Sequence, residues 1–536
     1  MKKIFVLSIA AVALALSSCN KFLETPVYGE NPELSSKDQI ERTVYGLMSV
    51  YDDQTGGEGV TGRGIAWFEA ASDNTVPGRN TAQAYQIRRF QMDSQNGRDA
   101  KNTWPVMYQI NKKANDIIGA VPGLNLEPAF ANWALGNAYF WRGLAMLWIA
   151  PYYADDINGG IPIILDTTPL SEYDAPRPKS ALDNYKQIIA DFEKAAGYLP
   201  LLSEQPLDQR GMAWKGAAWG FAARAALYAA QYDKSYYNTC IDYCNRIMAL
   251  DGENKRDIYT DGSGNDYANL FTRANNFSCE YLYSLVGNVG KNGPKYHGMS
   301  FENGGFRLYN TWGYFNPTMN LWKSYESGDK RRDATILYPG HEFTFVGRTF
   351  VYGSSRTYRP GTDTGLAYIK FLSPWHDADC IGKEVSQDGN FASNTLGMVL
   401  LRFADVCLMK AECLIELNGE GDAEAKNLIN KVRARAGLPE NTDATRDQLR
   451  HERRVELAFE YMPSRFHDLV RWGIAKDVCA QPTLGVKIAT LGDYSTISEF
   501  EFEPGREYKE GVNQVFAIPS TAFRGTVNLK QNVGYE

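Results

Sequence analysis

The sequence predicts a mainly α-helical protein, in which helix pairs stack as an irregular solenoid beside a loop-rich lobe with short strands. Three observations predict this class. Apolar residues recur with helical period through the first half of the chain and again near its end. Between them, from about 252 to 395, Gly, Asn, Asp, Tyr and Pro are dense, over a stretch too long for a plain loop. Trp133, Leu135, Gly136 and Tyr139 come within one residue of the tetratricopeptide (TPR) pattern, a repeat built from helix pairs.

The first residues have the pattern of an export signal. Lys2 and Lys3 precede an uncharged apolar run over residues 4–16. This run is shorter than the roughly 20 residues that a membrane-spanning helix needs, and it fits the apolar part of a secretory signal peptide. We therefore expect residues 1–18 to be a signal peptide.

A lipidation site follows the signal. Leu16-Ser17-Ser18-Cys19 places small residues before a cysteine, as in a bacterial lipobox. Lipidation of Cys19 by several acyl chains would anchor the protein firmly, because each buried methylene contributes about 0.8 kcal/mol. An ordinary signal peptide followed by an unmodified cysteine is the alternative. Residues 19–35 contain Pro26 and Pro32 and are predicted to be a tether.

An N-terminal helical region is predicted over 36–251. Ser35 or Ser36 can cap its first helix, whose apolar stripe runs from Ile40 to Tyr51. The longer helices of this region are predicted at 103–118, 133–150, 184–200, 210–233 and 237–250.

The rest of the chain divides into an irregular lobe and a second helical region. The lobe, 252–395, is predicted to bind the ligand and to contain short strands at 281–286 and 341–352. Helical period returns in a C-terminal region over 396–536. Its helices are predicted at 400–419, 422–436 and 446–461.

Composition limits the partners and the redox chemistry. The formal net charge is −7, and removal of Lys2 and Lys3 with the signal makes it −9. An acidic protein is a poor partner for nucleic acid or an anionic membrane, so neutral or basic ligands are expected. Eight cysteines, of which Cys19 is to be lipidated, leave an odd number and no disulfide framework. Cys240 and Cys244, at helical spacing, are expected to be buried apolar thiols.

Four segments together resemble the SusD family, also called RagB/SusD. Two of them are AYFWRGLAMLWIAPYYADDINGGIPII (138–164) and LLRFADVCLMKAECLIELNG (400–419). The third is HERRVELAFE (451–460) followed by FHDLVRWG (466–473), and the fourth is the ending from Ile518-Pro519 to Gln531-Asn532-Val533-Gly534-Tyr535. They stand in the order of the family, behind a lipobox.

The resemblance implies a fold and a role. The fold is a SusD-like scaffold of four TPR-type helix pairs with an irregular lobe. The role is capture of glycans, or in some members of peptides, by a protein that is lipid-anchored to the outer membrane, faces the cell exterior and acts as a lid over a TonB-dependent transporter.

Charges in the third segment alternate along two predicted helices. They are expected to form an ion network between the helices, with Arg–carboxylate pairs, rather than a catalytic site. The members are Glu452, Arg453, Glu456, Glu460, Arg465, Asp468 and Arg471.

No catalytic motif is recognisable in the sequence. His451-Glu452 is not followed by the second histidine of a zinc protease, and no nucleophile elbow or phosphate-binding glycine loop occurs. Asp257, Asp261 and Asp266 suggest a calcium loop, but the EF-hand spacing fails and a solvated turn is favoured. We therefore expect no enzyme activity, no catalytic metal and no cofactor; a structural calcium ion remains open.

A sugar site needs exposed flat rings beside fixed hydrogen-bonding groups. The tryptophans on helical stripes are expected to be core: Trp133, Trp141, Trp148, Trp214 and Trp219. Two irregular segments, 67–85 and 295–316, are better candidates, and Trp312 is the first choice. The other candidates are Trp67, Asp73, Asn74, Arg79, Tyr85, Tyr296, Tyr309 and Tyr314. For each ring, packing within the lobe is the alternative.

The favoured function is a non-catalytic glycan-binding lipoprotein that delivers oligosaccharides to a TonB-dependent transporter. Three alternatives stay open: the same fold capturing peptides, a surface glycoside hydrolase, and a TPR scaffold that binds the transporter alone. The hydrolase is disfavoured because neither a nucleophile motif nor a metal motif is present.

Overall fold

The computed structural model describes most of the chain. It describes residues 34–51, 65–78, 82–286, 315–345, 348–355, 357, 364–371, 396–460 and 464–536. The predicted signal peptide, Cys19 and the start of the tether lie outside these residues. Within them, no helix combines the length and apolar character that a bilayer crossing requires.

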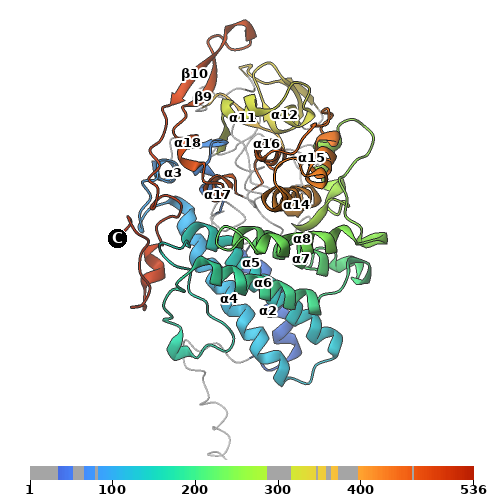
Figure 1. The fold of residues 1–536 in the computed structure, drawn as a ribbon, viewed down its shortest axis with the longest axis vertical. Coiled ribbons are helices and arrows are strands. Elements are labelled where there is room, and N and C mark those ends of the chain that lie inside the picture. Colours follow the sequence, from blue (N-terminus) through green and yellow to red (C-terminus); the bar gives the residue numbers. More distant parts are fainter. Residues whose placement is uncertain are drawn as a thin grey trace, which may run out of the picture.

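Stacked helices form the lower half of the molecule in Figure 1. They are α2 (Lys37–Tyr51), α4 (Thr103–Ala120), α5 (Pro128–Tyr153), α6 (Ala181–Tyr198), α7 (Lys215–Ala229) and α8 (Tyr236–Met248). From α4 onward each helix packs against the next one in the chain, α2 packs against α4, and α8 continues the stack to α14 (Phe403–Asn418) and α15 (Ala423–Arg435). The prediction of a mainly helical fold built from stacked helix pairs is confirmed.

The ends of these helices follow from local sequence. Ser180 caps α6 by accepting a hydrogen bond from the Leu182 amide, and the helix ends two residues before Pro200. The α7 helix begins at Lys215, five residues later than predicted, because Arg210–Trp214 forms a turn first. At Gly220, a Cβ atom would lie 2.3 Å from Leu401 Cδ2, so glycine lets α7 approach its neighbour closely.

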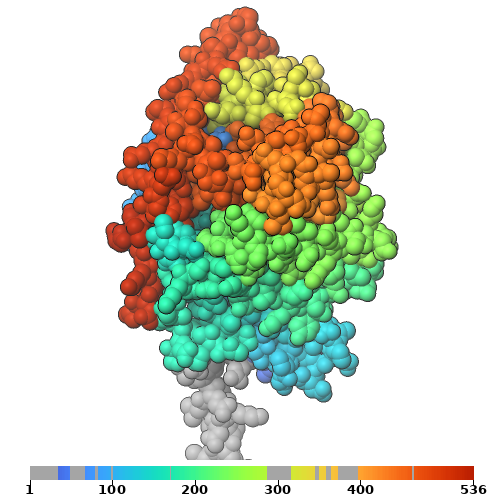
Figure 2. Space-filling model, in the orientation of Figure 1, coloured from blue at the N-terminus to red at the C-terminus, as the bar shows by residue number. Residues whose placement is uncertain are grey.

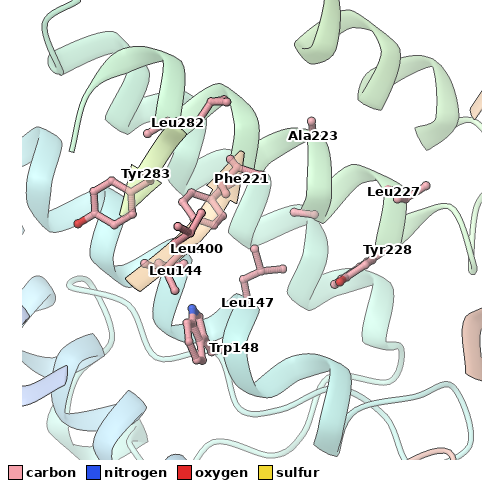
Figure 3. Close-up of a cluster of buried hydrophobic side chains, with 14 of the residues drawn as sticks. Leu144, Leu147, Trp148, Phe221, Ala223, Leu227, Tyr228, Leu282, Tyr283 and Leu400 are labelled. Carbon is pink, nitrogen blue, oxygen red and sulfur yellow. The ribbon is translucent and has the colours of Figure 1, made fainter. Parts of the chain in front are cut away.

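The core of the stack lies around α5 and α7. Figure 3 shows Leu144, Leu147 and Trp148 of α5 beside Phe221 and Leu227 of α7. As predicted, Trp141, Trp148 and Trp214 are buried; Trp133 and Trp219 are half-buried against the same core. The thiols of Cys240 and Cys244 are fully buried, also as expected.

The upper half combines most of the C-terminal region with short elements of the lobe, while the end of the chain runs down beside the stacked helices (Figures 1 and 2). Its remaining C-terminal helices are α16 (Arg446–Glu456), α17 (Arg465–Arg471) and α18 (Ala475–Cys479). The other short helices are α3 (Ala82–Arg88), α9 (Asp266–Leu270), α11 (Met319–Ser324), α12 (Lys330–Thr335) and the 3-10 turn η2 (Ile65–Ala71).

The described strands form two-stranded antiparallel sheets. The pairs are β1 (Thr75–Pro77) with β3 (Phe315–Pro317), β2 (Tyr281–Leu285) with β8 (Met398–Arg402), β4 (Ile336–Leu337) with β7 (Ala367–Tyr368), β5 (Glu342–Phe345) with β6 (Arg348–Val351), and β9 (Thr483–Ile488) with β10 (Ile497–Glu503). The predicted strand at 281–286 is confirmed. The single strand predicted at 341–352 is wrong, because β5 and β6 fold back on each other there.

Two predicted C-terminal helix boundaries are also wrong. The helix predicted at 400–419 begins at Phe403, because pairing with β2 draws residues 398–402 into a strand. The helix predicted at 446–461 ends at Glu456, and Phe459 then takes a left-handed backbone with φ +63°. In both places the local helical period does not decide where the helix lies.

Candidate functional site

The two segments predicted to bind a ligand meet in the structure. β1 and β3 pair with Thr75 opposite Pro317 and Pro77 opposite Phe315. Thr75 Oγ1 donates to the Asn316 carbonyl at 2.9 Å, across 241 residues of sequence. The ladder thus places the middle of one candidate segment beside the end of the other.

Several candidate residues lie outside the described part of the chain. Arg79 directly follows Gly78, and Tyr314 directly precedes Phe315. The remaining candidates outside the described residues are Tyr296, Tyr309 and Trp312. Their role in ligand binding stays a prediction.

The ring of Trp67 does not face solvent. It is fully buried and lies 4.7 Å from the Phe315 ring, centroid to centroid. The prediction that it is an exposed stacking platform is therefore wrong. The irregular sequence around it suggested a surface loop, but η2 turns the ring into the core beside β3.

Asp73 and Asn74 are tied to other side chains. Arg454 Nη2 lies 2.8 Å from one oxygen of Asp73, and Arg465 Nε lies 3.0 Å from the other. Arg454 Nε also donates to Asn74 Oδ1 at 2.9 Å. Burial raises the pKa of Asp73, but the charges of the two arginines lower it by more, so the pKa lies well below its usual range. These two residues fasten the first candidate segment to α16 and α17, a role that sequence reasoning missed.

Two more arginines hold the same segment from its other side. Arg88 donates to the carbonyls of Ala70, Ser72 and Thr75, at 3.2, 3.3 and 2.8 Å. Arg506 donates to the Ala71 carbonyl at 2.8 Å, and also to that of Ser72. The backbone before and within β1 is thus fixed by guanidinium groups, which gives the neighbouring candidate segment a rigid base.

Tyr85, another candidate, is half-buried at the surface of α3. The Arg89 guanidinium lies 4.9 Å from the centre of its ring. A cation over one face of an aromatic ring is a stabilising contact, so that face of Tyr85 is already used.

Glu69, buried behind Asp73, has an unusual environment. One carboxylate oxygen accepts from Ser72 Oγ at 3.0 Å, and the other accepts from the Arg465 amide at 3.1 Å. Burial, as the largest cause, raises the pKa of Glu69 to about 8. No motif marks this residue in the sequence, because its shift comes from packing.

The predicted ion network is observed and is buried, but most of its pairs join the two predicted helices to other elements rather than to each other. Each predicted member forms at least one ion pair: Glu452 and Glu456 with Arg331, Glu460 with Arg402, Arg453 with Asp405, Arg465 with Asp73, and Asp468 with Arg453 and Arg471. We call the part around Glu456 the central ion network: Arg331, Arg402, Arg435, Glu280, Glu452, Glu456 and Glu460. Its charges satisfy one another, which indicates a structural role.

Signs of a metal site are weak. Among the residues with assigned positions, no group of three or more His, Cys, Asp or Glu side chains is arranged to hold an ion. Asp266, one of the acidic residues of the suspected calcium loop, accepts hydrogen bonds from the Asp261 and Gly262 amides at 2.7 and 3.0 Å. Its carboxylate thus closes a turn at the surface.

The fold is shared with solved structures. A SusD-like protein from Bacteroides fragilis aligns with a TM-score of 0.77 and 20% identity, over 95% of this chain and 99% of its own. Surface glycan-binding protein A from Bacteroides thetaiotaomicron, in complex with laminarihexaose, aligns with a TM-score of 0.69 and 16% identity, over 92% and 99%. A protein described as a laminarin-binding SusD-like protein gives 0.67 and 22%, over the same shares.

Sequence comparisons agree. A SusD-like protein of Bacteroides ovatus is 25% identical over 76% of this chain and 73% of its own, and one of Formosa agariphila is 25% identical over 86% and 88%. Residues 21–227 match a family model described as "Starch-binding associating with outer membrane". Residues 229–535, more than half of the sequence, match the model of the SusD family. The chain therefore belongs to the SusD family.

Proposed function

We propose that this protein is a non-catalytic, surface glycan-binding lipoprotein. It captures oligosaccharides outside the cell and delivers them to a TonB-dependent outer-membrane transporter. Lipidation of Cys19 holds it at the outer membrane, facing the exterior. The site lies where the two candidate segments meet, beyond the β1–β3 ladder, with Trp312 as its principal ring.

Family membership supports glycan capture. Proteins of the same fold are named for glycan binding, and one of them was solved with a bound glucan, laminarihexaose. The family model over the first half refers to starch binding and the outer membrane. These relatives are the observation that carries the proposal.

The geometry of the described residues is compatible with it. Sugar recognition by stacking works best when the ring is held on a rigid base, since ordering a loop costs conformational entropy. Here the base is the backbone around β1, fixed by the Arg88, Arg454, Arg465 and Arg506 side chains. Trp312 stands three residues before β3 in the sequence.

A glycan panel with paired tryptophan variants tests the proposal. The chain from Lys21 onward is titrated with starch, fructan, plant and host glycans by calorimetry, and the products are checked for new reducing ends. We expect one neutral class to bind without turnover. Trp312→Ala should weaken that binding about tenfold or more, because stacking on a sugar face is lost.

Trp219→Ala is the matched control, because Trp219 is half-buried on α7 and packs against the helical core. It should bind as the unmodified chain does. New reducing ends would favour the hydrolase. A blank glycan panel with binding to a peptide library would favour peptide capture, and a blank in both would favour a scaffold that binds the transporter alone.

A further inference from the structure

A cavity lined by residues outside the two candidate segments lies near the end of the chain. Its volume is about 440 Å³. The walls come from the residues just after α3, from the segment that follows β10 and from the last residues of the chain. Drug-sized ligands occupy cavities of roughly 300–1,000 Å³, so this one has room for a small organic molecule.

One wall of the cavity is a buried arginine that lacks a carboxylate partner. Arg506 is 8% exposed. Its Nη1 and Nη2 atoms donate to the carbonyls of Ala71, Arg88 and Ser72 and to Cys479 Sγ. Within the described ranges, no acid forms an ion pair with it. A buried charge without a counter-charge is costly, so an anion in the cavity would be stabilised.

One of the two carboxylates that line the cavity is already paired. Glu503 accepts from Arg88 Nε at 2.6 Å. Burial, and then the charge of Arg506, lower the pKa of Arg88 to about 10. Because Glu503 is paired with Arg88, it does not compensate the charge of Arg506 within the described residues.

The rim adds more positive charge. The Arg89 side chain is 51% exposed, and its Nε atom is 3.5 Å from Glu503, a long contact. Lys509 is exposed and forms no ion pair with any described residue, and Glu507 is the remaining carboxylate of the rim. Among the residues that line the cavity, three cations (Arg89, Arg506 and Lys509) against two carboxylates (Glu503 and Glu507) leave a net charge of +1, in a chain whose total is −7.

An aromatic side chain is held in the wall by an unfavourable backbone. Phe90 has φ +57°, which is uncommon for a residue other than glycine. It closes α3 in a Schellman motif, in which the Gln91 amide donates to the Gln86 carbonyl and the Phe90 amide to that of Ile87. Glycine is usual at this position, so the ring is retained at a backbone cost. Its ring packs inside the wall, 5.6 Å from the Arg506 guanidinium and 5.7 and 5.5 Å from the ring centres of Phe466 and Tyr508.

We propose that this cavity binds a carboxylated sugar, a uronic acid unit, with its carboxylate toward Arg506, Arg89 and Lys509 and its ring in the remaining volume of the cavity. The carboxylate of the sugar compensates the positive charge of Arg506. A sugar ring fills a volume that a small inorganic anion would leave largely empty, and hydroxyls find acceptors in Glu507 and the cavity backbone. The described residues that line the cavity belong to neither candidate segment, and the proposal stands independently of the function proposed above.

The test compares acids with their neutral parents. The chain from Lys21 onward is titrated with glucuronate, galacturonate, glucose, galactose and acetate by calorimetry at low salt. We expect a uronate to bind at least about tenfold more tightly than its parent sugar and than acetate, and to bind more weakly as salt is added. Arg89→Gln and Lys509→Gln should each weaken binding about tenfold, the loss of one charged contact.

Two control variants show whether binding depends on this cavity. Arg246→Gln removes an arginine of similar exposure, 45%, on α8, and should leave uronate binding unchanged. Trp312→Ala should also leave it unchanged, whatever it does to neutral glycans. Absence of uronate binding, equal binding of acid and neutral sugars, or full binding in the Arg89→Gln/Lys509→Gln double variant would overturn the proposal. Acetate binding as tightly as the uronates would overturn its sugar part.

Discussion

The α5–α7 core and the central ion network are both buried, but the first is built from apolar side chains and the second from charged ones. In the core, Phe140 lies against Phe192, Phe221 and Tyr283, with ring centroids 4.9–5.7 Å apart. In the network, Glu456 contacts the guanidinium groups of Arg331, Arg402 and Arg435. Apolar contacts are many and individually weak, whereas each ion pair of the network compensates a particular buried charge. The protein should therefore lose less stability from a change of shape in the core than from the loss of one charged partner in the network.

Glu456→Gln should produce the largest loss of stability. The substitution keeps the shape of the side chain and removes its charge, so three buried arginines lose a shared counter-charge. We expect a decrease of about 3–5 kcal/mol in the free energy of unfolding, measured by urea denaturation. A loss below about 1 kcal/mol would contradict the comparison.

Glu69→Gln tests a buried carboxylate whose charge is not fully compensated. Because the pKa of Glu69 is about 8 in the folded chain and 4.5 ordinarily, the native state keeps a proton that the unfolded chain releases between those pH values. Stability of the unmodified chain should therefore fall as pH rises from about 4.5 to about 8, and Glu69→Gln should lack this contribution.

The expected size of that effect is about 2–4 kcal/mol, since one unit of pKa difference is equivalent to about 1.4 kcal/mol. Urea denaturation of both proteins at about pH 5 and about pH 8 measures it. The stability of Glu69→Gln relative to the unmodified chain should be higher at the upper pH than at the lower one. A difference independent of pH would show that the carboxylate is charged throughout. For Glu456 the sign is opposite: its arginines outweigh burial and lower its pKa, so its stabilisation is lost as pH falls.

Phe140→Leu examines the core by a change of shape. Phe140 is fully buried, and the replacement keeps an apolar side chain of moderately smaller volume. We expect a loss of about 1–2 kcal/mol in the same denaturation measurement, from a partly refilled cavity. A loss as large as that of Glu456→Gln would remove the distinction between the two regions.

Glu193→Gln should have the smallest effect on stability. It tests whether burial, rather than charge itself, makes loss of a partner in the network costly. Glu193 is 48% exposed and lies 3.1 Å from Arg246. Exposed ion pairs contribute about 0.2–1 kcal/mol, so the loss should stay in that range. A cost near that of Glu456→Gln would mean that solvent screening does not separate the two kinds of pair.

The sequence predicted helices well where the pattern was long and local. The helix predicted at 103–118 is observed as α4, and those at 184–200 and 237–250 are observed as α6 and α8 with ends shifted by up to three residues. Prediction failed where a distant strand competed: residues 400–402 have helical period but pair with β2. The charges of the third SusD-like segment do form an ion network, but most of their partners lie outside the segment, on α12, β8 and α14 and at Asp73.

The structure brings the two candidate segments together, but their role in ligand binding stays a prediction, and Trp67 is not the exposed ring that was predicted. The sequence identified two irregular segments, and the β1–β3 ladder does place them side by side. It could not show that Trp67 points inward or that Asp73 is held by Arg454 and Arg465, because the second of these partners lies 392 residues away.

By itself, then, the sequence determined the mainly helical class, the irregular lobe between two helical regions and the resemblance to the SusD family, because helical period and short motifs are properties of neighbouring residues. The tertiary structure alone decided which side chains are buried and which charges are compensated. Arg88 meets Glu503 across 415 residues, and within the described chain Arg506 beside it is left without an acid. Whether a charge is compensated depends on burial and on contacts between residues far apart in the sequence, which no local pattern encodes.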